Sequence, residues 1–305
     1  MSIWDRRELV RVAENGVATL REAFVRAPTP LEAQAAEALR QELRRLNDVE
    51  GALPFWRDTC EALARHAEEE DPRFFMRWPP IKSTMVNGTT AFSVDAYRRL
   101  RRTGDWKAVW KAGITHQPYG HGPPFLPYPR TNANTVMHAA HLLHFQSTTG
   151  RNWLAHDTIA EFGGGYGSMC RLAADLGFAG DYAIFDLPPI HALQRYYLTL
   201  HETIPRRSVL LTPSLSDVAR AMGPRSALMS TWALSEMPMP LREEIAALLH
   251  DTRVCSALFA YQRSFEGIDN VAWFADLAAR TADQWDWRLT RIDVNSDYLV
   301  GTRRP

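Results

Sequence analysis

The sequence has few cysteines, no excess of charge of either sign and no long apolar run, and each absence excludes a class of protein. The three cysteines, Cys60, Cys170 and Cys255, lie far apart without a C-x-x-C pair, which argues against a disulfide framework or a structural zinc site. Basic and acidic residues both number 35, so the chain lacks the basic surplus typical of nucleic-acid binders. No segment approaches the roughly 20 uncharged apolar residues of a membrane span.

These absences set our expectations of the protein's location and partners. The first residues, MSIWDRRELV, are charged where a signal peptide would be apolar, so we expect a cytoplasmic protein with reduced thiols. We predict a small molecule as partner, with no nucleic acid and no membrane, and leave a homodimer open.

Residues 1–150 and 151–305 differ in pattern. In the first half, apolar residues recur at helical spacing over 6–26, 30–46, 94–102 and 135–147, and strand signals are scarce. Residues 115–132, THQPYGHGPPFLPYPRTN, are too rich in proline and glycine for helix or strand. This loop is either a surface connector or a wall over a ligand site. We expect a helical N-terminal cap over a second, α/β domain.

The second half alternates short apolar runs with helical segments. Strands are expected at 158–162, 181–186, 208–212, 227–234 and 255–261, and helices at 168–177, 188–202, 215–222 and 241–251. This alternation predicts a parallel sheet with right-handed crossovers. Segments 286–294 and 297–304 are joined so tightly that they must be antiparallel strands. A mostly parallel sheet with an antiparallel C-terminal hairpin is the outline of the Rossmann-like class I methyltransferase fold, with an ordinary Rossmann dehydrogenase as the alternative.

The segment EFGGGYGSMCRL, residues 161–172, places a glycine-rich loop after the first strand, where open α/β sheets bind ligands. The dinucleotide pattern G-x-G-x-x-G fails at Ser168. The loop does satisfy E-x-G-x-G-x-G through Glu161, Gly163, Gly165 and Gly167. That form suits S-adenosylmethionine, which has an ammonium group and a ribose but no phosphate. A glycine turn that serves only helix packing is the alternative.

Asp186 closes the second strand and is placed to accept hydrogen bonds from both ribose hydroxyls. An acid at this position also serves NAD, so Asp186 does not discriminate between the two cofactors.

Three segments in the same order resemble the sugar O-methyltransferase family of S-adenosylmethionine-dependent enzymes: EFGGGYGSMCRL, AIFDLPPIHALQRYYL at 183–198 and STWALSEMP at 230–238. Members of that family have a similar E-x-GGGYG loop, a D-L-P-x-x-x-x-L-Q-x-Y-x-L stretch and an S-E-M box. The similarity covers roughly residues 130–300 and implies the fold, the cofactor and methyl transfer. It leaves the acceptor open between a sugar hydroxyl, another natural-product group and an aromatic metabolite such as an indole or phenol. An NAD(P)-dependent oxidoreductase is a lower alternative.

Methyl transfer to a hydroxyl requires that donor and acceptor be held in line and that the hydroxyl proton be removed. Glu236 is the first candidate base because it follows the fourth strand, and a glutamate that stabilises a helix N-terminus is the alternative. His191, His116 and His121 are further catalytic candidates, against locally hydrogen-bonded histidines. His138, His141 and His144 are three residues apart and fit core or surface positions better than a metal site, so we predict no metal.

The remaining cofactor contacts are expected along the carboxyl edge of the sheet. The candidates are Tyr166 in the loop, Leu187 beside Asp186, Ser214 and Leu215 near the adenine, Thr231 and Trp232 near the methionine portion, and Arg130 for the methionine carboxylate. Each of these has a structural alternative as a helix cap or core residue.

Overall fold

The computed structural model describes residues 9–10, 12–14, 16–17, 26–46, 49, 52–116 and 119–305. The helix predicted over 6–26 lies largely outside the described residues.

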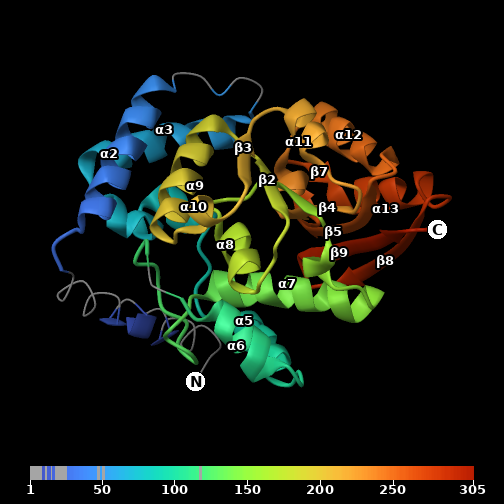
Figure 1. Ribbon diagram of the computed structural model, residues 1–305, viewed down its shortest axis with the longest axis horizontal. Coiled ribbons are helices and arrows are strands. Elements are labelled where there is room, and N and C mark those ends of the chain that lie inside the picture. The colour runs from blue at the N-terminus through green and yellow to red at the C-terminus, as the bar shows by residue number, and fades with distance from the viewer. Residues whose placement is uncertain are drawn as a thin grey trace.

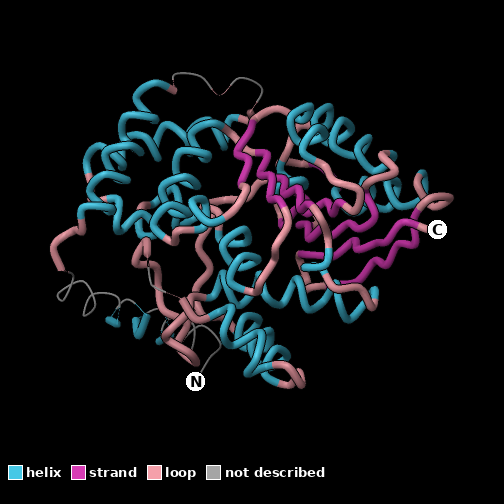
Figure 2. The backbone as a smooth tube through the Cα atoms, viewed as in Figure 1, coloured by secondary structure: helices cyan, strands magenta, loops and turns pink. Residues whose placement is uncertain are grey.

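A seven-stranded sheet with the order β3-β2-β1-β4-β5-β9-β8 forms the centre of the molecule (Figure 2). Its strands are β1 Thr158–Phe162, β2 Asp181–Phe185, β3 Val209–Thr212, β4 Ser226–Thr231, β5 Val254–Gln262, β8 Trp285–Arg291 and β9 Ser296–Arg303. The first five are parallel, and β9 pairs antiparallel with both β5 and β8. The predicted fold class, including the C-terminal hairpin, is therefore confirmed.

Helices cover both faces of this sheet (Figure 1). One face carries α7 Ala133–Thr149, α8 Ser168–Asp175 and α9 Pro188–Leu200, and the other carries α11 Leu215–Ala221, α12 Met239–Ala247 and α13 Asn270–Arg280. Alternate residues of β1 enter two separate apolar cores, Ile159 on the α8 side and Ala160 on the α12 side. This is the pattern of a parallel strand buried on both faces. A short helix, α10 Thr203–Arg206, follows α9.

The N-terminal region is helical, as predicted, and packs on the α9 side of the sheet (Figure 1). It contains α2 Pro30–Arg45, α3 Pro54–Glu69, η1 Pro72–Arg77, α4 Pro79–Thr84, α5 Ala91–Arg101, η2 Trp106–Trp110 and α6 Lys111–Ile114. Leu39 of α2 and Leu63 of α3 lie in the same apolar core as Leu193 of α9. The described residues of the 115–132 loop form neither helix nor strand. None of the described helices is long and apolar enough to cross a membrane.

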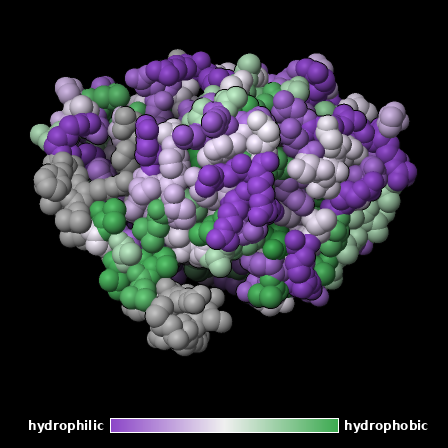
Figure 3. Space-filling model, turned by 90° about the horizontal axis from the view of Figure 1, so that it is seen from below, coloured by the Kyte–Doolittle hydropathy of each residue, from purple (hydrophilic) through white to green (hydrophobic). Residues whose placement is uncertain are grey.

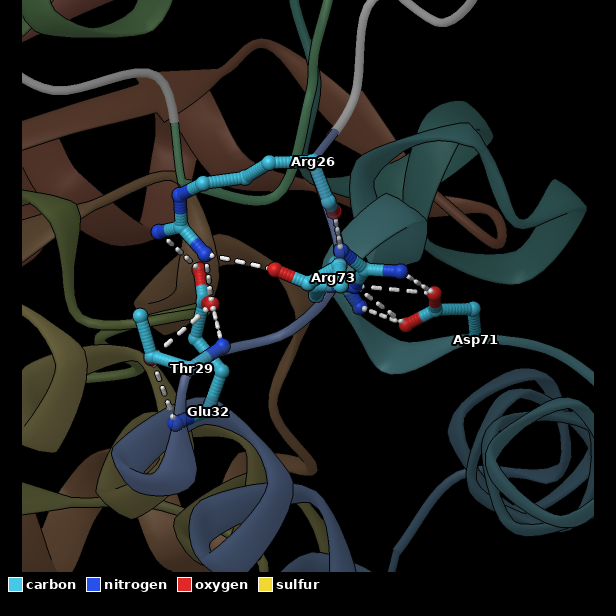
Figure 4. A network of polar contacts seen from close by, with 6 residues as sticks. Arg26, Thr29, Glu32, Asp71 and Arg73 are labelled. Carbon is cyan, nitrogen blue, oxygen red and sulfur yellow. Dashed lines mark hydrogen bonds and ion pairs between the residues drawn. The ribbon is translucent and has the colours of Figure 1, made fainter.

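A polar network fixes the start of α2 to the rest of the cap (Figure 4). Thr29 caps the helix, and Glu32 accepts hydrogen bonds from the Thr29 backbone N–H at 2.7 Å and from Arg26 at 2.7 Å. Arg73 of η1 pairs with Asp71 and donates to the Arg26 carbonyl oxygen at 2.7 Å. Burial raises the pKa of Glu32, but the bonds from Arg26 and Thr29 outweigh it and lower that pKa to about 2.

Candidate functional site

The carboxyl ends of β1, β2 and β4 meet at one edge of the sheet, and hydrogen bonds join the loops that leave them. The Gly163 N–H donates to the Phe185 carbonyl oxygen at 2.9 Å, which ties the glycine loop to β2. The Ser230 hydroxyl donates to the Phe162 carbonyl oxygen at 2.9 Å, which ties β4 to β1. The site predicted from three strand ends is therefore a single local structure.

The glycine loop requires glycine for two separate reasons. Gly163, Gly165 and Gly167 have φ angles of 75°, 53° and 91°, in the region that favours glycine. A Cβ atom at Gly163 would lie 2.0 Å from the Cβ of Ala233, so close packing also excludes a side chain there. At Gly165 the nearest neighbour of such an atom would be Met85 at 3.8 Å. Gly165 is thus the position where the backbone is most open to a ligand.

Glu161 lies directly beneath this loop. Its side chain is buried and accepts a hydrogen bond from the Tyr182 hydroxyl at 2.8 Å. Burial, and the nearby Asp186 carboxyl, raise the pKa of Glu161 to about 8, against the hydrogen bond from Tyr182. The carboxyl at the end of β1 thus changes its charge near neutral pH.

Asp186 follows β2 and turns toward the glycine loop. Its carboxylate accepts from the Leu187 N–H at 2.8 Å and from the Gln194 side-chain amide at 2.9 Å. Gln194 also donates to the Gly165 carbonyl oxygen at 2.9 Å, so it links the acid to the loop. Burial raises the pKa of Asp186 to about 7, although backbone N–H groups of Leu187, Gly164 and Gly165 oppose this.

Glu236 ends η4 Ala233–Glu236, the short helical turn that follows β4. Its carboxylate accepts from the Gln262 amide at 2.7 Å. Burial raises the pKa of Glu236 to about 7, against hydrogen bonds from Gln262 and from the Trp56 indole. A carboxyl that titrates near neutral pH at the mouth of a site has the property expected of a general base.

Trp232 makes the sharp turn between β4 and η4. It has φ 77° and ψ −47°, which is unusual for a residue with a side chain. Its N–H donates to the Ala260 carbonyl oxygen of β5 at 2.7 Å, and its ring lies 6.1 Å from that of His141. Thr231, the last residue of β4, is buried.

Three residues of the cap reach this edge, and no sequence pattern indicated them. Trp56 and Cys60 of α3 lie on one helical face, with Trp56 hydrogen-bonded to Glu236 and Cys60 close enough to Asp186 for the carboxylate to raise the pKa of its thiol. Burial is the larger cause of that increase, to about 12. Met85 follows α4 and faces Gly165. The cap therefore covers the carboxyl ends of β1, β2 and β4.

The other predicted cofactor contacts occupy structural positions at or near this edge. Ser214 caps α11 by accepting from the Asp217 N–H at 3.3 Å, and Leu215 packs partly against the α12-side core. Leu187 precedes the first turn of α9. Tyr166 is buried, with its ring 5.0 Å from Tyr197, and points away from the edge into the cap. Their roles in binding stay predictions.

The histidine candidates and Arg130 lie elsewhere. His191 is buried beneath α9 and hydrogen-bonds the Ile184 carbonyl oxygen, and burial lowers its pKa to about 4. His121 has φ 46° and its ring lies 4.9 Å from Phe74 of η1. His116 and Arg130 line a different pocket, beside the far ends of α8 and α9. The structure does not bring these four residues together with Glu236, and their functional roles stay predictions.

The chemistry of the edge fits S-adenosylmethionine. Among the described residues, Glu161, Asp186 and Glu236 make no ion pair with a basic side chain within 4.0 Å. Uncompensated carboxyl groups favour a cationic ligand, and the sulfonium and ammonium groups of this cofactor carry positive charge. A dinucleotide pyrophosphate would be repelled. In the described part of the chain, no three His, Cys, Asp or Glu side chains are arranged to hold a metal ion.

No protein-family profile and no curated protein sequence matches the chain. The chain is similar in structure to an rRNA methylase from Escherichia coli, with 13% identity, a TM-score of 0.39 and coverage of 88% of this chain and 100% of that chain. It is similar to precorrin-6y C5,15-methyltransferase from Geobacter metallireducens, with 12% identity, a TM-score of 0.40 and coverage of 57% and 89%. The methyltransferase domain of bacterial CtHen1 has 11% identity, a TM-score of 0.42 and coverage of 52% and 94%.

One prediction from the sequence is contradicted by these similarities. Proteins named as rRNA methylases are among the similar structures, so the prediction that nucleic acid is not a partner is wrong. Its physical weakness is that a balanced total charge does not describe local charge. Residues 98–130 hold Arg98, Arg99, Arg101, Arg102, Lys107, Lys111 and Arg130 against the single acid Asp105. The face on which α5 and α7 lie is largely hydrophilic (Figure 3).

Proposed function

We propose that this protein is an S-adenosylmethionine-dependent methyltransferase that methylates a hydroxyl group of a small molecule, with Glu236 as the general base. The observation that carries the proposal is the set of three carboxyl groups, without basic partners, at the ends of β1, β2 and β4 around a glycine loop. This set favours a cofactor with positive charge and a ribose over a dinucleotide.

The residues divide into a cofactor side and an acceptor side. The Gly163–Gly167 backbone and Asp186 hold the cofactor, with Asp186 accepting the ribose hydroxyls. Glu161 stabilises positive charge from beneath the loop. The bound cofactor supplies an electrophilic methyl group on a sulfonium. Glu236 takes the proton of the acceptor hydroxyl as its oxygen forms the new bond, and the electron pair of the broken carbon–sulfur bond stays on sulfur.

The contacts of Glu236 support its role as base. The Gln262 amide fixes one carboxylate oxygen at 2.7 Å, and Trp56 donates to the carboxylate from the cap. With a pKa of about 7, a substantial fraction of Glu236 is ionised at neutral pH. We propose a sugar or another hydroxylated natural product as acceptor, bound between η4 and α3.

Calorimetry with S-adenosylmethionine and S-adenosylhomocysteine tests the first part of the proposal. We expect both to bind at micromolar concentrations, and NADH not to bind. Absence of binding by either methyl-donor compound would end the proposal, whereas binding of NADH alone would establish the oxidoreductase alternative.

A transfer assay with methyl-labelled cofactor tests the acceptor and the base. Sugars, phenols, indoles and total RNA are offered separately, and label in RNA alone would refute a small-molecule acceptor. With an active acceptor, Glu236→Gln should lower kcat by about 100-fold while cofactor affinity changes little. Glu244→Gln, an exposed acid on the neighbouring α12, is the matched control and should keep wild-type rates. A wild-type kcat in Glu236→Gln would remove this residue from the mechanism.

A further inference from the structure

A second pocket of 570 Å³ lies outside the cofactor edge. One wall is the loop after α6, including Tyr119, Pro123 and Pro124, and the other wall is formed by Asp175 and His201. Asp175 ends α8 and His201 follows α9. These helices have 8 and 13 residues and begin at the cofactor edge, so at 1.5 Å per residue their far ends lie about 12 to 20 Å from it. That separation is too large for a shared ligand to receive the methyl group.

The pocket contains an unsatisfied polar atom. The Nε2 atom of His201 is buried and has no hydrogen-bond partner among the described residues. The ring is fixed edge-to-face by Tyr119 at 4.8 Å and by Tyr197 at 4.5 Å. A buried polar atom without a partner costs free energy unless a ligand or water supplies the bond. His201 therefore points to a ligand with an oxygen at this position.

The charge around the pocket is positive. Its carboxylate, Asp175, forms an ion pair with the buried Arg171 guanidinium, which also donates to the Thr135 hydroxyl at 3.1 Å. Arg206 and Arg207 act on the same carboxylate electrostatically. The charge of Asp175 is thus compensated, and Arg130, exposed at the rim, adds a further positive charge.

The wall opposite His201 is apolar and rigid. Pro123, Pro124 and Pro129 line it together with the Tyr119 ring. Proline has a fixed φ and loses little entropy when a ring packs against it. A pocket of this volume, with a flat apolar wall and a few polar groups, is typical of a small-molecule site.

We propose that this pocket is a second ligand site for a small anionic ring compound, whose oxyanion is bound by Arg130 and His201 and whose ring packs on the prolines. The shared chemistry is a carboxylate or phosphate on a flat ring. The proposal does not rest on methyltransferase activity, because this pocket contains none of the residues assigned to the cofactor.

Binding of benzoate, phenyl phosphate and the uncharged benzamide to the full chain, measured by calorimetry without cofactor, tests the site. We expect one or both anions to bind, and benzamide to bind at least about tenfold more weakly, the effect of losing a charge-assisted hydrogen bond. The better anion identifies the ligand class. No binding by either anion, or equal binding of benzamide, would overturn the proposal.

Two variants locate the binding. Arg130→Gln should weaken anion binding about tenfold, and Ala112→Phe should block it by filling the pocket from an exposed position on α6. Arg151→Gln, an exposed arginine just beyond the opposite end of α7, is the control and should bind like wild type. Circular dichroism checks that each variant is folded. Unchanged anion binding in both pocket variants would refute the assignment, as would a loss in Arg130→Gln of S-adenosylmethionine binding alone.

Discussion

The affinity for S-adenosylmethionine should rise with pH through neutrality because of Asp186. Burial raises the pKa of this carboxyl to about 7 in the free protein. The ribose hydroxyls are donors, so they bind the ionised form, and binding must lower the pKa. The complex therefore holds fewer protons than the free protein, and protons are released on binding.

The size of the effect follows from that pKa. About nine tenths of the Asp186 carboxyl groups are ionised at pH 8 and about one tenth at pH 6. If the complex requires the ionised form, the dissociation constant should be about tenfold higher at pH 6, which is about 1.4 kcal/mol. At pH 7 each binding event should release about half a proton.

Calorimetry in two buffers of different ionisation enthalpy measures both quantities. S-adenosylhomocysteine has the same ribose but no sulfonium charge, so it should show the same dependence. Asp186→Asn should bind about 100-fold more weakly at pH 8, since two charge-assisted hydrogen bonds are lost, and its affinity should not vary between pH 6 and pH 8. Asp181→Asn, at the exposed start of the same strand, is the control. A pH-independent affinity in the wild type, or a dependence that survives in Asp186→Asn, would refute this reasoning.

Three further predictions concern stability. Glu32→Gln should destabilise the fold by about 1 to 3 kcal/mol at pH 7 in urea unfolding, because it removes a carboxylate whose pKa is lowered to about 2; this contribution is present above about pH 4.5 and is lost as pH falls toward 2, and the exposed Glu37→Gln on the same helix should cost almost nothing. Gly163→Ala should lower the melting temperature more than Gly177→Ala, since both positions have positive φ but only the first places a Cβ against Ala233, and equal effects would refute the packing argument. Asp186→Asn should raise the stability of the cofactor-free protein at pH 8 by about 2 kcal/mol, because ionising a buried acid opposes folding above its raised pKa; lower stability at pH 8 would contradict this.

The sheet and its site loops could be predicted because their signals are local. Apolar runs bounded by turn residues gave every strand of the seven-stranded sheet, and the turn at Asn295 fixed the direction of the last two. Glu161, Asp186 and Glu236 could be placed because parallel strands end at the same edge.

Two helices were missed although they had readable signals. α3 has Trp56, Cys60, Leu63 and Ala67 at helical spacing after a proline in its first turn. α13 follows Asp269, a helix cap that accepts from the Ala272 N–H at 3.0 Å. Both patterns satisfy the rules that found the other helices.

The environment of the site was not predictable, for a different reason. The contacts of Trp56 with Glu236 and of Met85 with Gly165 join the two halves of the chain. Such contacts depend on how the cap packs on α9, and a periodic pattern records only which face is buried and not what covers it. The raised pKa values of the carboxyl groups follow from this covering, so the electrostatic character of the site could be derived only from the structure.

The turn at Trp232 shows how the fold positions the candidate base. A residue with a side chain at φ 77° and ψ −47° costs about 1–3 kcal/mol relative to an ordinary turn. Neighbouring bonds hold it there: Trp232 N–H to Ala260, Ser235 N–H to the Trp232 carbonyl oxygen at 2.9 Å, and Leu234 N–H to the Ser230 hydroxyl at 2.9 Å. Because the chain reverses within one residue, η4 begins at the sheet edge itself and Glu236 stays beside Gln262 of β5. An extended turn would carry the carboxylate beyond the reach of Gln262, so the strain at Trp232 maintains the geometry on which the proposed chemistry depends.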